Sequence, residues 1–84
     1  MNKKIDILEE MAEAIDYIRD CSLEDLRKPS VELNKIINSY NFARERAIKL
    51  KMDVSEFPEK ISQNIGNLME VKSWNVSTIP LHNY

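Results

Sequence analysis

The side chains that most often carry out chemistry are scarce in this chain of 84 residues. His82 is the only histidine and Cys21 the only cysteine, so neither a zinc site of Cys and His ligands nor an internal disulfide can be assembled. Gly66 is the only glycine, which excludes a glycine-rich loop for binding phosphate groups. We expect Cys21 at the boundary of the core rather than as a nucleophile. The sequence therefore predicts no enzyme activity, no metal site and no cofactor.

One pattern near the N-terminus resembles part of a known enzyme family. Ile5 and Asp6, followed by Arg19, resemble the first-helix pattern of small helical chorismate mutases. That resemblance implies that Arg19 binds a carboxylate of the substrate. Glu13 and Asp16, however, occupy positions where the family pattern has leucines. Because any amphipathic helix offers such spacings, we interpret the segment as an ordinary helix.

A second group of side chains is basic. Four bases fall within eight residues, Arg44, Arg46, Lys49 and Lys51, and Glu45 is the only acidic residue among them. Basic residues at the end of a helix complement the negative end of its dipole, and this is the favoured interpretation. A nucleic-acid surface would need further bases on the same face and interleaved aromatic residues. Nucleic acid is therefore a disfavoured partner, and binding of RNA or DNA through this stretch is kept as an alternative.

The first half of the chain predicts three helices. Apolar residues at steps of three and four predict an amphipathic helix over residues 3–21, with Ile5, Leu8, Met11, Ala12, Ile15 and Ile18 on its inner face. Ser22 and Asp25 form a capping-box pattern that begins a short helix over residues 23–28. Ser30 caps a long helix over residues 31–51, with a seam of Leu33, Ile36, Tyr40, Ala43, Ala47 and Leu50. A neighbouring stripe of Ile37, Asn41, Arg44 and Ile48 implies that this helix contacts more than one neighbour.

The second half predicts a fourth helix and a tail. Asp53 or Ser55 is expected to cap a helix that runs to Lys72, with Pro58 tolerated in its first turn. Its apolar face would comprise Phe57, Ile61, Ile65, Leu68 and Met69, and the glycine within it weakens the prediction. From residue 73 onward the helical pattern stops, and Pro80 disfavours a helix, so we expect an extended C-terminal tail.

Together these elements predict an all-α fold, a small antiparallel bundle of three to four helices with an extended C-terminal tail. Residues 1–72 would form the bundle domain and residues 73–84 the tail. Hydrophobic residues make up 43% and charged residues 31%, which is typical of a globular protein. No apolar run is long enough for a membrane span, and no signal sequence is present, so we expect a cytoplasmic protein.

Charge is distributed unevenly along the chain. Residues 1–25 carry eight acidic and three basic residues, a net charge of −5, whereas residues 26–84 carry a net charge of +3. Such opposite ends can attract within the fold or pair between two copies, so a homodimer is left open. A small core also favours stabilisation by a partner.

The tail holds the only tryptophan, and two roles for it are open. It either folds back over the helices or binds a partner through Trp74, Val76, Ile79, Leu81 and Tyr84. By elimination, we expect a protein-binding regulator or inhibitor that occupies a surface of another protein, of the kind that phages and other mobile elements carry. A bacteriocin immunity protein is an alternative, because that family is similar in size and layout.

Overall fold

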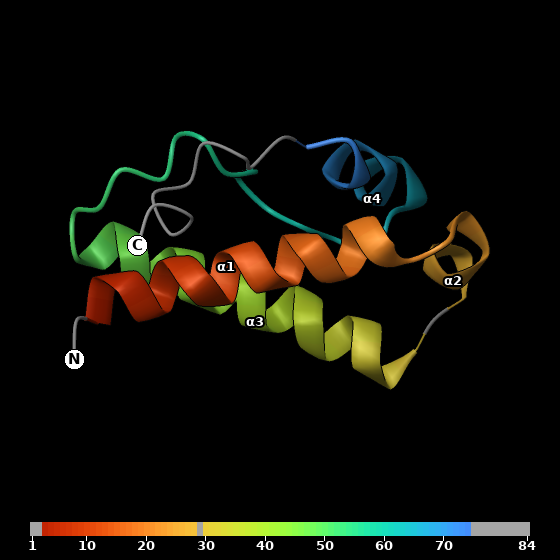
Figure 1. Ribbon diagram of the computed structural model, residues 1–84, viewed down its shortest axis with the longest axis horizontal. Helices are drawn as coiled ribbons and strands as arrows, with labels where there is room; N and C mark the ends of the chain where they lie inside the picture. Colours follow the sequence, from red (N-terminus) through yellow and green to blue (C-terminus); the bar gives the residue numbers. More distant parts are fainter. Residues whose placement is uncertain (1–2, 29, 75–84) are drawn as a thin grey trace.

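The computed structural model describes residues 3–28 and 30–74, which form four helices (Figure 1). These are α1 (Lys3–Asp20), α2 (Leu23–Arg27), α3 (Val31–Lys49) and α4 (Ile65–Lys72), and no strand is present in the described ranges. The predicted all-α class and the helix count are confirmed. α1 and α3 pack side by side in opposite directions, and α4 lies against α1 and α2 (Figure 1). The predicted tail lies outside the described residues from position 75 onward.

The core lies mainly between α1 and α3. Met11, Ile15 and Ile18 of α1 are fully buried, as are Tyr40 and two small residues of α3, Ala43 and Ala47. Because these two side chains are small, they leave room for α1 to pack against α3. Deletion of one such buried aliphatic side chain down to alanine costs about 2–5 kcal/mol in well-packed cores.

The apolar stripe of α1 is wider than its sequence pattern predicts. Ile7 and Ala14 are also buried, whereas Ile5 and Leu8 are only half-buried. α1 contacts both α3 and α4, so two neighbouring faces of the helix are covered instead of one. Leu50 and Ile48, expected on or beside the inner seam of α3, are 42% and 50% exposed because they lie where the helix ends and the chain turns away.

Serine caps begin both α2 and α3, as predicted. The backbone N–H of Asp25 donates to the Ser22 hydroxyl at 3.1 Å, and the Ser22 N–H donates to the Asp25 carboxylate, so the capping box is complete. The Ser30 hydroxyl accepts from the N–H of Leu33 at 3.0 Å. These bonds satisfy donors that the first turn of a helix leaves without partners, and they fix the break between α1 and α3.

α3 ends two residues earlier than predicted, in a left-handed turn at Lys51. Lys51 has a φ of 58°, and the N–H of Met52 donates to the carbonyl of Ala47 at 3.0 Å. The Lys51 N–H donates to the carbonyl of Ile48 at 2.9 Å, which completes the paired bonds of a Schellman motif. Glycine is the usual residue at this position because a side chain there is strained. The turn reverses the chain and sends it back along α3.

The predicted final helix is wrong over residues 53–64. The carboxylate of Asp53 accepts from the backbone N–H of Ser55 at 3.0 Å, so the expected cap is present, but only a short turn follows it. The chain then runs without helix from residue 56 to Asn64, and the Asn64 side chain caps α4. Ile65 and Met69 are consequently exposed, and Val71 is buried with Leu68 instead. Gly66 lies in the first turn of α4 rather than in the middle of a helix.

The α3–α4 segment, residues 52–64, lies against α3 because α3 side chains bond its backbone. The Tyr40 hydroxyl donates to the Pro58 carbonyl at 2.5 Å. The amide of Asn41 donates to the Ile61 carbonyl at 2.8 Å and accepts from the Ile61 N–H at 3.1 Å. These bonds replace the helical bonds that residues 53–64 would otherwise make. The second stripe predicted on α3 therefore does contact another part of the chain.

The last turn of α4 is joined to the end of α1 by a lysine. The Lys72 ammonium donates to the backbone carbonyls of Arg19 and Cys21, each at 2.5 Å. Carbonyls at a helix C-terminus have no partner within the helix and carry partial negative charge, so a cation is favourable there. This contact fixes α4 beside the C-terminal end of α1. None of the helices in residues 3–28 and 30–74 is long and apolar enough to cross a membrane.

Candidate binding surface

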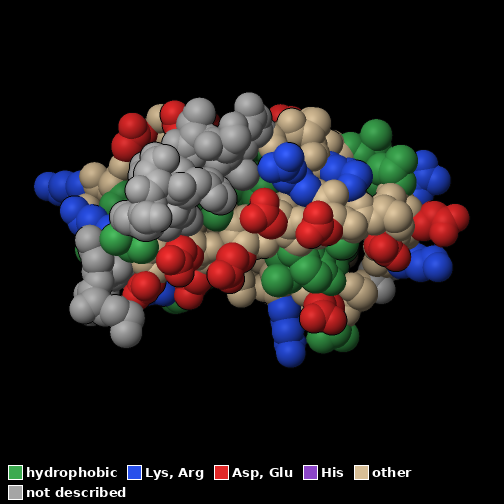
Figure 2. All heavy atoms as spheres, viewed as in Figure 1, with side chains coloured by type: hydrophobic (Ala, Val, Ile, Leu, Met, Phe, Trp, Pro, Cys, Tyr) green, Lys and Arg blue, Asp and Glu red, His purple; other side chains and the backbone are tan. Residues whose placement is uncertain are grey.

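The outer side of α1 carries the strongest concentration of charge. Its exposed carboxylates, which we call the acidic face, are those of Asp6, Glu9, Glu10, Glu13, Asp16 and Asp20. They recur every three or four residues because the same helix places its apolar residues on the opposite side. Figure 2 shows Asp and Glu side chains following the front of the molecule, where α1 lies in Figure 1.

The acidic face is only weakly neutralised. Glu10 pairs with Arg46 at 3.8 Å, with the two side chains 51% and 42% exposed. No other ion pair connects the acidic face to the described residues. An exposed pair of this kind contributes only about 0.2–1 kcal/mol. The remaining carboxylates therefore face solvent, and their field extends outward over about one Debye length, near 8 Å at physiological salt.

Trp74 follows α4 and is half-buried. It packs against the hydrophobic core, its backbone N–H donates to the Val71 carbonyl at 2.9 Å, and its indole N–H donates to the Glu56 carbonyl at 2.6 Å. The indole hydrogen bond joins α4 to the α3–α4 segment and fixes the orientation of the ring. Val76, Ile79, Leu81 and Tyr84, the other tail residues expected to bind a partner, lie outside the described residues.

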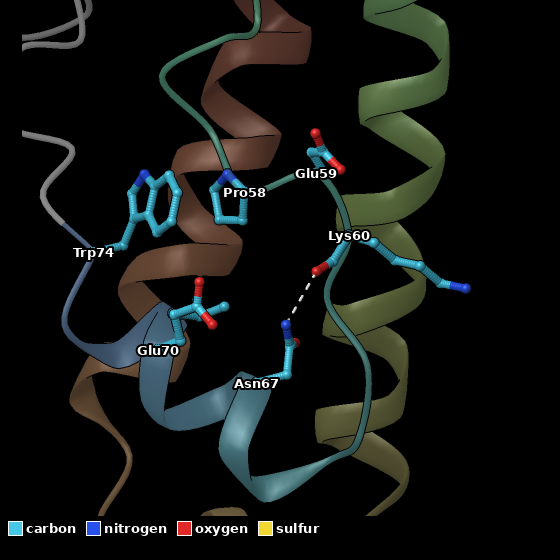
Figure 3. A pocket seen from close by; sticks show the side chains of 7 residues that line it. Pro58, Glu59, Lys60, Asn67, Glu70 and Trp74 are labelled. Carbon is cyan, nitrogen blue, oxygen red and sulfur yellow. Dashed lines mark hydrogen bonds between the residues drawn. The ribbon is translucent and has the colours of Figure 1, made fainter.

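A surface groove of about 340 Å³, which we call the Trp74 groove, lies beside this indole. Its lining comes from the α3–α4 segment at residues 58–60, from α4 at Asn67, Glu70 and Val71, and from Trp74 (Figure 3). The Asn67 side chain donates to the Lys60 carbonyl at 3.4 Å and closes one end. In Figure 3 the Glu70 carboxylate points toward the rings of Trp74 and Pro58, whereas the Lys60 ammonium points away.

The basic residues of the α3 C-terminus do not share one face. Arg44 and Arg46 are two positions apart, which on a helix places them about 200° apart. Arg46 lies over the Phe42 ring at 5.8 Å from its centroid and pairs with Glu10, while Arg44 lines a groove against the α3–α4 segment. Lys49 ends α3 and Lys51 occupies the left-handed turn. The four side chains therefore form no single positive surface.

Cys21 lies at the boundary of the core. The residue is half-buried, and burial followed by the nearby Asp25 carboxylate raises the pKa of its thiol. A thiol with a raised pKa is protonated at neutral pH and is a weak nucleophile.

Asp6 and Arg19, the two charged residues of the pattern that resembles chorismate mutases, are both exposed on α1.

Sequence reasoning found Trp74 but missed the residues that surround it. Pro58 was expected in a helical first turn, and no role was predicted for Asn67 or Glu70. One signal was present: Glu70 precedes Trp74 by four residues, a spacing at which side chains near a helix end are neighbours. The contribution of residues 58–60 could not be seen, because it depends on the course of the α3–α4 segment.

The fold and surface define a small all-helical protein with one strongly acidic face and a groove beside its tryptophan. Within residues 3–28 and 30–74, no three His, Cys, Asp or Glu side chains are grouped so as to hold a metal ion. No protein-family model, curated protein or solved structure matches this chain.

Proposed function

We propose that this protein is a small non-catalytic regulator or inhibitor that binds another protein and acts by occupying a basic surface on it. The observation that carries the proposal is the acidic face, whose carboxylates are exposed along four turns of α1 and, apart from Glu10, form no ion pair with described residues. Unneutralised charge on one side of a small protein favours a partner of the opposite sign.

The acidic face would act chiefly on the rate of association. Complementary charges steer two proteins together and raise the association rate constant, and the effect weakens as salt concentration rises. Rim charges contribute less to the lifetime of a complex than a buried apolar contact does. A complete interface therefore also needs an aromatic or apolar contact, and we propose that Trp74, half-buried beside its groove, supplies it.

The test compares two triple variants in affinity capture from native-host extract, with captured proteins identified by mass spectrometry. The first variant neutralises the acidic face with Glu9→Gln, Glu13→Gln and Asp16→Asn. The matched control removes the same number of exposed charges elsewhere with Glu24→Gln, Glu32→Gln and Glu45→Gln. We expect a protein with a basic surface to be captured by the wild type and the control but not by the first variant.

Circular dichroism of all three proteins should be the same, since every substituted side chain is exposed. Equal capture by both variants would contradict the proposal. So would a captured partner whose binding is insensitive to salt between low and physiological concentrations.

A further inference from the structure

We propose that the Trp74 groove binds the guanidinium group of an arginine side chain presented by a partner protein. This inference rests on the proposed function for the kind of partner, and it names the side chain that one part of the surface recognises. Three features of the groove support it: a fixed aromatic ring, a Glu70 carboxylate without an ion pair, and a cation that points away.

The aromatic wall is held in place before any ligand binds. The indole N–H of Trp74 donates to the Glu56 carbonyl, and the residue packs against the core, so the ring is fixed on one side while it lines the groove on the other. Pro58, which is buried, lies beside the indole (Figure 3) and is itself held by the bond from the Tyr40 hydroxyl to its carbonyl. A ring that is already ordered loses little conformational entropy when a ligand binds.

The charged lining favours a cation. Glu59 and Glu70 are exposed carboxylates that line the groove, and neither forms an ion pair with the described residues. The Glu70 carboxylate points toward Trp74, whereas the Glu59 carboxylate lies on the far side of Pro58 from the indole (Figure 3). Lys60 also lines the groove, but its ammonium is directed away from Trp74 (Figure 3). A cation over the face of a tryptophan is attracted by the ring, and Trp is the best of the aromatic residues for this contact. The neighbouring Glu70 carboxylate adds a charge-assisted hydrogen bond for a cation that carries N–H groups.

Guanidinium fits this combination better than other cations do. Its flat face can stack on an indole while its edge donates paired hydrogen bonds to a carboxylate, and an ammonium cannot do both. A quaternary ammonium has no N–H to donate and is usually enclosed by several aromatic residues, whereas this groove has one. The apolar side chains of Pro58 and Val71 can cover the methylene stem of an arginine.

The experiment uses the full chain and nuclear magnetic resonance. Because the protein has a single tryptophan, its indole N–H signal reports on the groove directly. The probe is acetyl-arginine-amide, and the control ligand is its citrulline counterpart, which has nearly the same shape without the charge. We expect the signals of Trp74 and Glu70 to shift with the arginine probe, with a dissociation constant of about 1 mM, as suits one side chain in an open groove. The citrulline probe should shift them little.

Two variants separate a specific site from general attraction. Glu70→Gln should weaken binding of the arginine probe by about three- to fivefold, the effect of one exposed charge pair. Glu32→Gln removes an equal charge from an exposed position of α3 outside the groove and should leave binding unchanged. Equal weakening by both variants, no weakening by Glu70→Gln, or equal shifts with citrulline would overturn the proposal.

A further result would also overturn it. If Trp74 and Pro58 showed proton contacts with residues 75–84 and the arginine probe shifted neither signal, the chain itself would fill the groove. The proposed function can survive that result, because it is tested on the acidic face. Partner capture that is lost with the Glu9, Glu13 and Asp16 variant but unaffected by Glu70→Gln would keep the proposed function and reject the groove.

Discussion

The hydroxyl of Tyr40 donates a buried hydrogen bond of 2.5 Å to the backbone carbonyl of Pro58. Tyr40 lies in the inner seam of α3 and has no exposed surface, so its ring packs in the core while its hydroxyl reaches the α3–α4 segment beyond. One residue therefore links the α1–α3 pair to the segment that forms one wall of the Trp74 groove.

Tyr40→Phe should keep the ring and remove this bond. The Pro58 carbonyl would lose its partner at a site that excludes water, and a buried acceptor left in this way costs about 1–3 kcal/mol. We expect urea denaturation followed by circular dichroism to show that loss with helical content unchanged. Tyr17→Phe is the control, because Tyr17 is only half-buried and makes no side-chain hydrogen bond with the described residues. A stability equal to that of the wild type would show that the bond contributes nothing.

Tyr40 should also make stability depend on alkaline pH. Burial raises the pKa of its phenol, an effect that the nearby Arg44 only partly offsets. The folded state thus holds the proton more tightly than the unfolded state, whose tyrosine pKa is near 10. The contribution is complete below about pH 10 and declines as pH rises toward the folded-state pKa. The stability difference between wild type and Tyr40→Phe, measured from pH 8 to 11, should therefore shrink above about pH 10, and a constant difference would refute this.

Asn41→Ala should loosen the α3–α4 segment without unfolding α3. The Asn41 side chain makes two hydrogen bonds to the backbone of Ile61, and alanine makes neither, so we expect a loss of about 1–3 kcal/mol. Hydrogen exchange at the Ile61 amide should accelerate more than exchange within α1. Asn38→Ala, at an exposed position of the same helix, is the matched control and should change neither quantity. Uniform acceleration across all helices would instead indicate global destabilisation.

Lys51→Gly should stabilise the protein. Among the residues that the structure describes, Lys51 is the only non-glycine residue with a positive φ. The left-handed region costs a residue with a side chain about 1 kcal/mol relative to glycine. Part of the gain is offset by the greater freedom of glycine in the unfolded chain. Thermal unfolding should show a higher midpoint. Lys49→Gly, in the last turn of α3, should lower it, and a fall with both variants would show that the turn is not strained.

Local sequence signals were sufficient to predict the first three helices. α1 and α3 have apolar residues at helical spacing over four turns or more, and the serine caps of α2 and α3 bond the backbone within three residues. Such signals need no knowledge of distant parts of the chain. The acidic face could likewise be read from the sequence, because the helix period alone separates its carboxylates from the apolar side.

Residues 52–64 could not be read in the same way. Asp53, Pro58 and the apolar Phe57 and Ile61 are compatible with a helical first turn, and Phe57 and Ile61 are in fact buried. Their conformation is set by hydrogen bonds from Tyr40 and Asn41, residues 18 and 20 positions away from their partners. Local preference for a helix is weak, and contacts of this kind override it.

By itself, then, the sequence determined the all-α class, the breaks at Ser22 and Ser30, and the charge of α1, because each follows from spacing and caps within a few residues. Only the tertiary structure decided that the chain returns along α3 without helix, that Lys72 joins the end of α1, and that Glu70 and Pro58 lie beside Trp74. These relationships depend on bonds between residues far apart in the chain, which no local pattern encodes.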